Sequence, residues 1–238
     1  MYQYSGITKL PFLKGLKVPK TIYITESKYN GKIEVIEIGK TRKIKVGGID
    51  QSLNWDAPNA STLVWGKLVE VIKANIPDLK NIMVLGLGGG TVQQLLSRKF
   101  PGTYITSVEI DNTMVDIAKK YFDLDSIPNH KVIVEDACRV VVTPTDFGAN
   151  KNSFEAVVVD IYIGDKYPEL GKSGNFVSAL RNLLLPGGLV VFNRIYTKHH
   201  QEDVNSFIDF VEGFYHNVQT YTVAGHTNSD NVIIYGRA

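Results

Sequence analysis

The 238-residue sequence has a single cysteine, Cys138, and no apolar stretch near the ~20 residues that cross a membrane. One cysteine excludes a disulfide within the chain. Cys138 lies among apolar neighbours in EDACRVVV, which favours a small buried side chain over a nucleophile. The segment MYQYSGITKL lacks the apolar core of a secretory signal peptide. These features predict a cytoplasmic protein without a membrane-inserted segment.

A strong charge excess is also missing, because the formal net charge at pH 7 is +2. A dedicated nucleic-acid binder is therefore not expected. Residues 1–45 nevertheless hold ten Lys or Arg against three Glu. These cations are spaced among strand-like residues and never form a block. A solvated sheet face is the favoured interpretation, and an anionic partner is the alternative.

Two nucleotide-binding motifs are absent. The sequence has no GxxxxGK[ST] loop for a triphosphate, and the turn GLGGG lacks the third glycine spacing of the dinucleotide fingerprint GxGxxG. A metal site is not expected either, because His199 and His200 have no third candidate ligand nearby. The chain has instead four glycines directly after the apolar run 82–85: Gly86, Gly88, Gly89 and Gly90.

The rhythm of the sequence changes near residue 55. Before it, segments such as GKIEVIEIG alternate apolar and polar positions around the turn residues Asn30-Gly31 and Gly39, which predicts antiparallel strands. After it, apolar strands without that alternation are separated by helical patterns, as expected when helices cover both faces of a parallel sheet. We therefore predict a small antiparallel β domain over residues 1–54. Residues 55–238 are predicted to form a doubly wound, mostly parallel, seven-stranded Rossmann-like α/β domain.

The expected elements of the larger domain follow from these patterns. Its helices are predicted over residues 60–75, 91–99, 112–122, 137–142, 173–185 and 201–213. Its strands are predicted over residues 82–86, 103–110, 131–136, 154–162, 188–194, 218–225 and 231–238. The short connection HTNSDN between the last two strands suits a hairpin, so the final strand is expected to run antiparallel at or near the sheet edge.

The glycine turn and two acids fall at three successive predicted strand ends. A glycine turn lets a ligand approach the backbone, although close packing of a helix would also explain it. Glu109 stands 23 residues after Gly86 and can accept both hydroxyl hydrogens of a ribose. Asp136 can accept a hydrogen bond from an amino group such as that of adenine, or alternatively cap the next helix. Together they predict an adenosine-type ligand in one crevice.

A family resemblance rests on motifs in a fixed order. The segments VGGIDQS, VLGLGGG, VEID, EDA and VVVDIYIGDKYP resemble those of the class I S-adenosylmethionine-dependent transferases and, more narrowly, the spermidine synthase family. The resemblance implies that S-adenosylmethionine or its decarboxylated form is the cofactor. It also implies that Gln51 closes over this cofactor, and that the chain dimerises. The implied cofactor contacts are Gln51, Gly86, Gly88, Gly89, Gly90, Glu109 and Asp136.

Several positions depart from that family's pattern. The Asp of the family's GGGDG turn is Gly89 here, the second Asp of its DxxD strand end is Ile163, and Val64-Trp65-Gly66 stands where the family has a Tyr-His pair. A Gly cannot pair with an ammonium and an Ile cannot accept a proton, so ordinary spermidine synthesis is disfavoured. The bare N–H groups of a turn at a helix N-terminus can instead receive the carboxylate of intact S-adenosylmethionine.

Methyl transfer to a small acceptor is therefore the leading hypothesis. Aminopropyl transfer in polyamine synthesis is one alternative, and a non-catalytic nucleoside-binding or scaffold protein is another. Asp160 is the expected base, with a structural capping role as its alternative. Tyr162 is expected to pack on the acceptor, and Asp165 to reach the space of the missing Asp. Asn193 is expected either to meet the substrate or to satisfy backbone groups.

Overall fold

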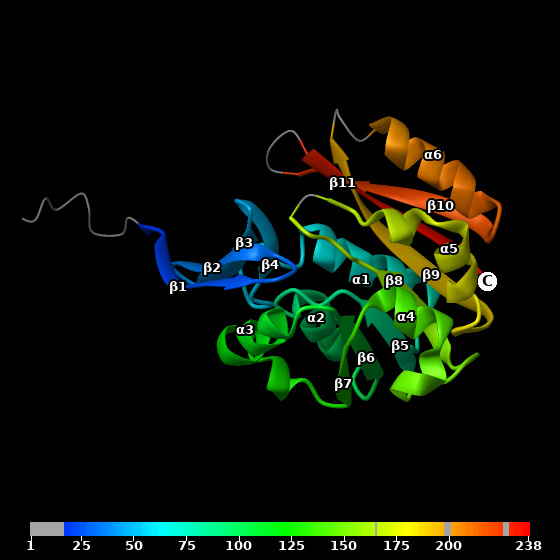
Figure 1. Ribbon diagram of the computed structural model, residues 1–238, viewed down its shortest axis with the longest axis horizontal. Helices are drawn as coiled ribbons and strands as arrows, with labels where there is room; N and C mark the ends of the chain where they lie inside the picture. The colour runs from blue at the N-terminus through cyan, green and yellow to red at the C-terminus, as the bar shows by residue number, and fades with distance from the viewer. Residues whose placement is uncertain (1–16, 165, 198–200, 226–228) are drawn as a thin grey trace, which may run out of the picture.

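A computed structural model describes residues 17–164, 166–197, 201–225 and 229–238. Its largest element is a seven-stranded sheet in the order β10-β11-β9-β8-β5-β6-β7 (Figure 1). The pairs among β9, β8, β5, β6 and β7 are parallel, whereas β11 runs antiparallel to both β9 and β10. The strands are β5 (Asn81–Leu85), β6 (Tyr104–Glu109), β7 (His130–Val134), β8 (Phe154–Val159), β9 (Leu184–Thr197), β10 (His216–Val223) and β11 (Ser229–Arg237).

Helices cover both faces of this sheet, which confirms the predicted doubly wound architecture. Alternate residues of β5 serve the two cores: Ile82 and Val84 pack under the helices of one face, and Met83 and Leu85 under those of the other. The first face carries α1 (Val64–Asn75), α2 (Thr91–Lys99) and α3 (Asn112–Phe122). The second carries α4 (Ala137–Val142), α5 (Gly174–Leu180) and α6 (Gln201–Glu212). Short 3-10 helices are η2 (Leu124–Ser126), η3 (Pro144–Phe147) and η4 (Glu169–Lys172).

A second sheet holds the N-terminal strands. Strands β1 (Lys20–Ser27), β2 (Gly31–Ile38), β3 (Thr41–Val46) and β4 (Ile49–Leu53) pair antiparallel in sequence order. Figure 1 shows this small sheet, in blue, beside α3 at one end of the molecule. Its buried face, which includes Ile33 and Ile44, packs against Met114, Ile117 and Phe122 of α3. The packing against α3 brings β4 to the N-terminal end of α2, where Leu53 is hydrogen-bonded to Thr91.

The element boundaries differ from the expectations at a few places. Helix α1 begins at Val64, after the turns of residues 54–63, instead of at residue 60. Helix α5 ends at Leu180 because the chain turns there and enters β9 at Leu184. Strand β11 is antiparallel as predicted and lies one strand in from the edge, which is β10. None of the helices in the described part of the chain is long and apolar enough to span a membrane.

Candidate functional site

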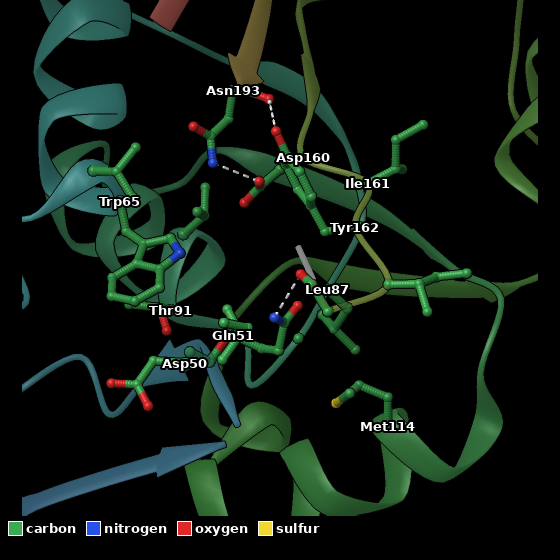
Figure 2. A pocket seen from close by; sticks show the side chains of 18 of the residues that line it. Asp50, Gln51, Trp65, Leu87, Thr91, Met114, Asp160, Ile161, Tyr162 and Asn193 are labelled. Atoms are coloured by element: carbon green, nitrogen blue, oxygen red, sulfur yellow. Dashed lines mark hydrogen bonds between the residues drawn. The ribbon is translucent and has the colours of Figure 1, made fainter. Parts of the chain in front are cut away.

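A cavity of about 990 Å³ opens at the carboxyl ends of the parallel strands, beneath the small sheet. The residues that follow β5, β6, β7 and β8 all contribute to its wall, and strand β9 adds Asn193. Figure 2 shows Asp160 and Asn193 facing each other above Gln51, with the Trp65 indole to one side. Residues Glu109, Asp136 and Asp160 therefore meet in one crevice, as the strand order predicts.

The glycine turn is shaped by close packing. Gly86 has φ +97°, and a Cβ there would lie 2.1 Å from the carbonyl oxygen of Asp160. Gly88 has φ +55°, and a Cβ there would lie 2.5 Å from the hydroxyl of Ser52. Gly86 and Gly88 line the cavity, whereas Gly89 and Gly90 are not among its lining residues. Glycine is thus required here because β8 and β4 both approach the turn closely.

The N–H groups of the turn are already hydrogen-bonded within the protein. Gly89 N–H donates to the Ser52 hydroxyl at 2.7 Å, and Leu87 N–H donates to Glu109 Oε2 at 3.1 Å. Gly90 N–H donates to the carbonyl of Leu87 at 2.9 Å. The Gly89 N–H is therefore already paired with Ser52, and the binding of a cofactor carboxylate by this turn stays a prediction. The sequence alone could not reveal this pairing, because Ser52 belongs to the other sheet.

Glu109 ends β6 and braces the turn while lining the cavity. Its Oε1 accepts from Asp111 N–H at 2.9 Å, and its Oε2 accepts from Leu87 N–H. Burial raises the pKa of this carboxyl, and the backbone donors Asp111 and Leu87 act in the opposite direction. A carboxylate has about four lone-pair sites, so Glu109 retains capacity to accept hydroxyl hydrogens of a ligand.

Asp136 caps helix α4 and lines the same cavity. Its Oδ1 accepts from Cys138 N–H at 2.8 Å, so the capping role foreseen for it is realised in the structure. Cys138 is half-buried beside this cap, and burial raises the pKa of its thiol to about 11. The thiol is consequently protonated at neutral pH and a poor nucleophile.

Asp160 follows β8, and two asparagine side chains from β9 and β11 form a chain of hydrogen bonds that ends on its carboxylate. Asn193 Nδ2 of β9 donates to Asp160 Oδ1 at 2.7 Å, and Asn231 Nδ2 of β11 donates to Asn193 Oδ1 at 2.9 Å (Figure 2 shows the first of these). Burial raises the pKa of Asp160, and the Asn193 hydrogen bond opposes that shift. Asn231 was not among the predicted site residues, since nothing in a strand pattern marks an amide that contacts Asp160 only through Asn193.

Tyr162 lines the cavity, and its hydroxyl is hydrogen-bonded to β9. This hydroxyl accepts from Ile195 N–H at 2.7 Å and donates to the carbonyl of Asn193 at 3.2 Å. Burial raises the pKa of the Tyr162 phenol, so it stays protonated. The structure thus gives Tyr162 an anchoring contact in addition to its place on the cavity wall. Asp165 lies outside the described residues.

Gln51 reaches across the cavity from the small sheet. Its Nε2 donates to the carbonyl of Gly164 at 2.9 Å, which joins β4 to the loop that follows β8. The role of Gln51 in closing over a cofactor, which the family resemblance implies, stays a prediction. Within the described part of the chain, no three His, Cys, Asp or Glu side chains are arranged as metal ligands.

Comparison with known proteins places the chain in a family. The model of the spermine/spermidine synthase domain matches residues 64–238. The chain belongs to this family. A polyamine aminopropyltransferase of Vibrio vulnificus is 27% identical to this chain over 150 residues. The match covers 63% of this chain and 49% of that protein. The human eEF1A lysine and N-terminal methyltransferase is 25% identical over 122 residues, covering 48% of this chain and 17% of that protein.

A solved structure supports the fold. The spermidine synthase from Thermotoga maritima aligns with a TM-score of 0.72 at 15% identity, over 91% of this chain and 72% of that one. Identity this low shows a shared fold and no more. The matched regions span about half of the Vibrio relative and a smaller part of the human one.

Proposed function

We propose that this chain transfers an aminopropyl group from decarboxylated S-adenosylmethionine to an amine. The family match and the aminopropyltransferase relative support this reaction class. The cavity also fits a sulfonium nucleoside, because Glu109 has lone pairs for ribose hydroxyls and Asp136 lies at the next strand end. Its volume of about 990 Å³ leaves room for a second small molecule.

The hydrogen bonding of the glycine turn supports the choice of decarboxylated S-adenosylmethionine as the group donor. The N–H groups of Leu87, Gly89 and Gly90 are hydrogen-bonded to protein atoms, so they do not offer a carboxylate three unused donors. The nearby wall presents the carboxylate of Asp160, which repels a donor carboxylate and attracts an ammonium. A decarboxylated tail, which ends in an ammonium alone, suits these surroundings better than the tail of intact S-adenosylmethionine.

Asp160 is the group we assign to the amine acceptor. Burial raises the pKa of Asp160, and a less acidic carboxyl group is the better proton acceptor when ionised. Asn193 fixes the carboxylate orientation through Oδ1 and leaves Oδ2 for the acceptor nitrogen. The donor, when bound, would supply the aminopropyl group: the acceptor nitrogen bonds to its terminal carbon, the C–S bond breaks and methylthioadenosine leaves. Asp160 takes the proton that the nitrogen loses.

Methyl transfer is the second candidate, because one observation favours it. Ile163 stands where the family has its second Asp, lines the cavity and has 41% of its surface exposed. An apolar side chain there gives a polyamine no charged contact. The similarity to a human methyltransferase is consistent with this alternative.

The nucleoside product distinguishes the two reactions. We would incubate the protein with each donor and a panel of amines, and identify the product by mass spectrometry. Methylthioadenosine formed from decarboxylated S-adenosylmethionine, and lost in Asp160→Asn, is the expected result. S-adenosylhomocysteine as the product would establish methyl transfer instead. Tight nucleoside binding without either product would favour the non-catalytic alternative.

A further inference from the structure

The cavity wall that belongs to the small sheet carries two lysines. Along β3, Thr41, Lys43 and Lys45 line the cavity, whereas Ile44 and Val46 point to the opposite face and pack on α3. This is the period-two alternation of a strand whose two faces have different surroundings. Lys43 and Lys45 are therefore placed by the strand register, with the buried isoleucine and valine fixing which face they occupy.

These two cations share one carboxylate. Lys43 Nζ lies 3.0 Å from Asp50 Oδ2, and Lys45 Nζ lies 3.6 Å from Asp50 Oδ1. Their side chains are 18% and 28% exposed, so both are partly withdrawn from water. Asp50 is the only acid among the cavity-lining residues that β2, β3 and β4 contribute. The wall consequently carries a surplus of positive charge.

The lining residues that come from the end of β10, and those that follow Asp160 in the described part of the loop after β8, include no acid. One wall is formed by Val223, Ala224 and Gly225 at the end of β10, and another by Gly164 and Pro168 after β8. The acids of the cavity other than Asp50 lie at the strand ends: Glu109, Glu135, Asp136 and Asp160. The cavity is thus acidic along the large sheet and basic along the small sheet.

We propose that the acceptor is a small amine that also bears a carboxylate, with its amine toward Asp160 and its carboxylate bound by Lys43 and Lys45. This inference rests on the proposed transfer to an amine. A plain diamine satisfies Asp160 but brings a second ammonium to the basic wall, where like charges repel. An acceptor with both groups matches the charge of both walls.

Putrescine and ornithine test this pairing, because ornithine is putrescine with one added carboxylate. We would measure their binding by calorimetry to the full chain saturated with methylthioadenosine. Ornithine is expected to bind roughly tenfold more tightly than putrescine at low salt, and the difference is expected to shrink as salt is raised. Equal binding, tighter binding of putrescine, or no binding of ornithine would overturn the proposal.

Three substitutions sharpen the test. Lys45→Gln is expected to weaken ornithine binding roughly three- to tenfold and to leave putrescine unchanged or slightly tighter. Asp50→Asn removes the competing carboxylate and is expected to act in the opposite direction on ornithine. Lys40→Gln removes the same charge from the exposed β2–β3 turn, outside the cavity, and is expected to change neither ligand. Parallel changes for both ligands would contradict a direct carboxylate contact.

The test of the carboxylate-bearing acceptor can fail or succeed independently of the test of aminopropyl transfer. If ornithine binds preferentially and neither donor is consumed, the charge pairing stands and aminopropyl transfer fails. If methylthioadenosine forms with putrescine and not with ornithine, the transfer stands and the carboxylate-bearing acceptor fails.

Discussion

At the scale of single residues, Asn193 controls the protonation of Asp160. Its Nδ2 donates to the carboxylate at 2.7 Å and so lowers a pKa that burial raises. Asn193→Ala removes that donor, so the pKa of Asp160 is expected to rise further and this proposed base to be protonated over a wider pH range. The acid limb of the pH profile of kcat/KM is expected to move to higher pH. Asn231→Ala, which removes the donor to Asn193 Oδ1, is expected to produce a smaller shift; an unmoved limb in both variants would refute the role.

A second residue-scale prediction concerns His130 and stability. Burial lowers the pKa of His130 to about 4, and its Nε2 lies 2.9 Å from the hydroxyl of Ser107 on the neighbouring strand β6. The unfolded chain binds the proton near pH 6.5 and the folded chain only near pH 4, so stability falls as pH drops through this window. Between pH 7 and pH 5 the loss is expected to be roughly 2 kcal/mol.

Urea unfolding at the two pH values checks this dependence. In His130→Asn the titrating group is gone, so the difference between pH 7 and pH 5 is expected to shrink by most of that amount. His216 is exposed, and His216→Asn serves as the control. In this variant the difference in unfolding free energy between pH 7 and pH 5 is expected to remain. Equal slopes in wild type and His130→Asn would rule out His130 as the source.

At the scale of secondary-structure elements, the hydroxyl of Thr91 joins helix α2 to strand β4 of the small sheet. It donates to the carbonyl of Leu53 and accepts from Leu53 N–H, and the site is buried. Thr91→Val keeps the shape but leaves both backbone groups without a partner, so unfolding is expected to become easier by about 2 kcal/mol. Thr91→Ser keeps the hydroxyl and is expected to lose less than half of that. Denaturant unfolding of both variants provides the measurement, and equal losses would contradict the hydrogen-bond explanation.

The elements themselves were largely predictable, because periodicity reports burial directly. Helices 91–99 and 112–122 were predicted with their observed bounds, and the apolar strands were found because both their faces are covered. Strand β9 was predicted four residues too late at its start, since Pro186 and two glycines read as a turn. Pairwise contacts between distant elements leave no such pattern. The hydrogen bond from Gly89 N–H to the Ser52 hydroxyl could therefore not be predicted.

At the scale of the whole molecule, the cavity exists because the small sheet is fixed over the strand ends. Asp111 is one of the points that fix it: it is buried, caps α3 through Thr113 N–H and accepts from Ser27 and Asn30 of the small sheet. Arg42 of β3 adds a bond of 2.6 Å to the carbonyl of Tyr121. Because Gln51 and Lys43 project from this sheet into the cavity, its docking and ligand binding are expected to be coupled.

Asp111→Ala tests that coupling. The variant loses three acceptor contacts at the junction, so hydrogen exchange is expected to accelerate in β1 to β4 while β5 and β8, in the centre of the large sheet, keep their protection. Affinity for methylthioadenosine is expected to fall about tenfold, since each lost charged hydrogen bond costs ~1.5–3 kcal/mol and only part of that reaches the cavity. Asp116→Ala, on the exposed side of α3, is the matched control. Faster exchange throughout both sheets would instead mean that Asp111 supports the entire fold, because a local junction would leave the large sheet protected.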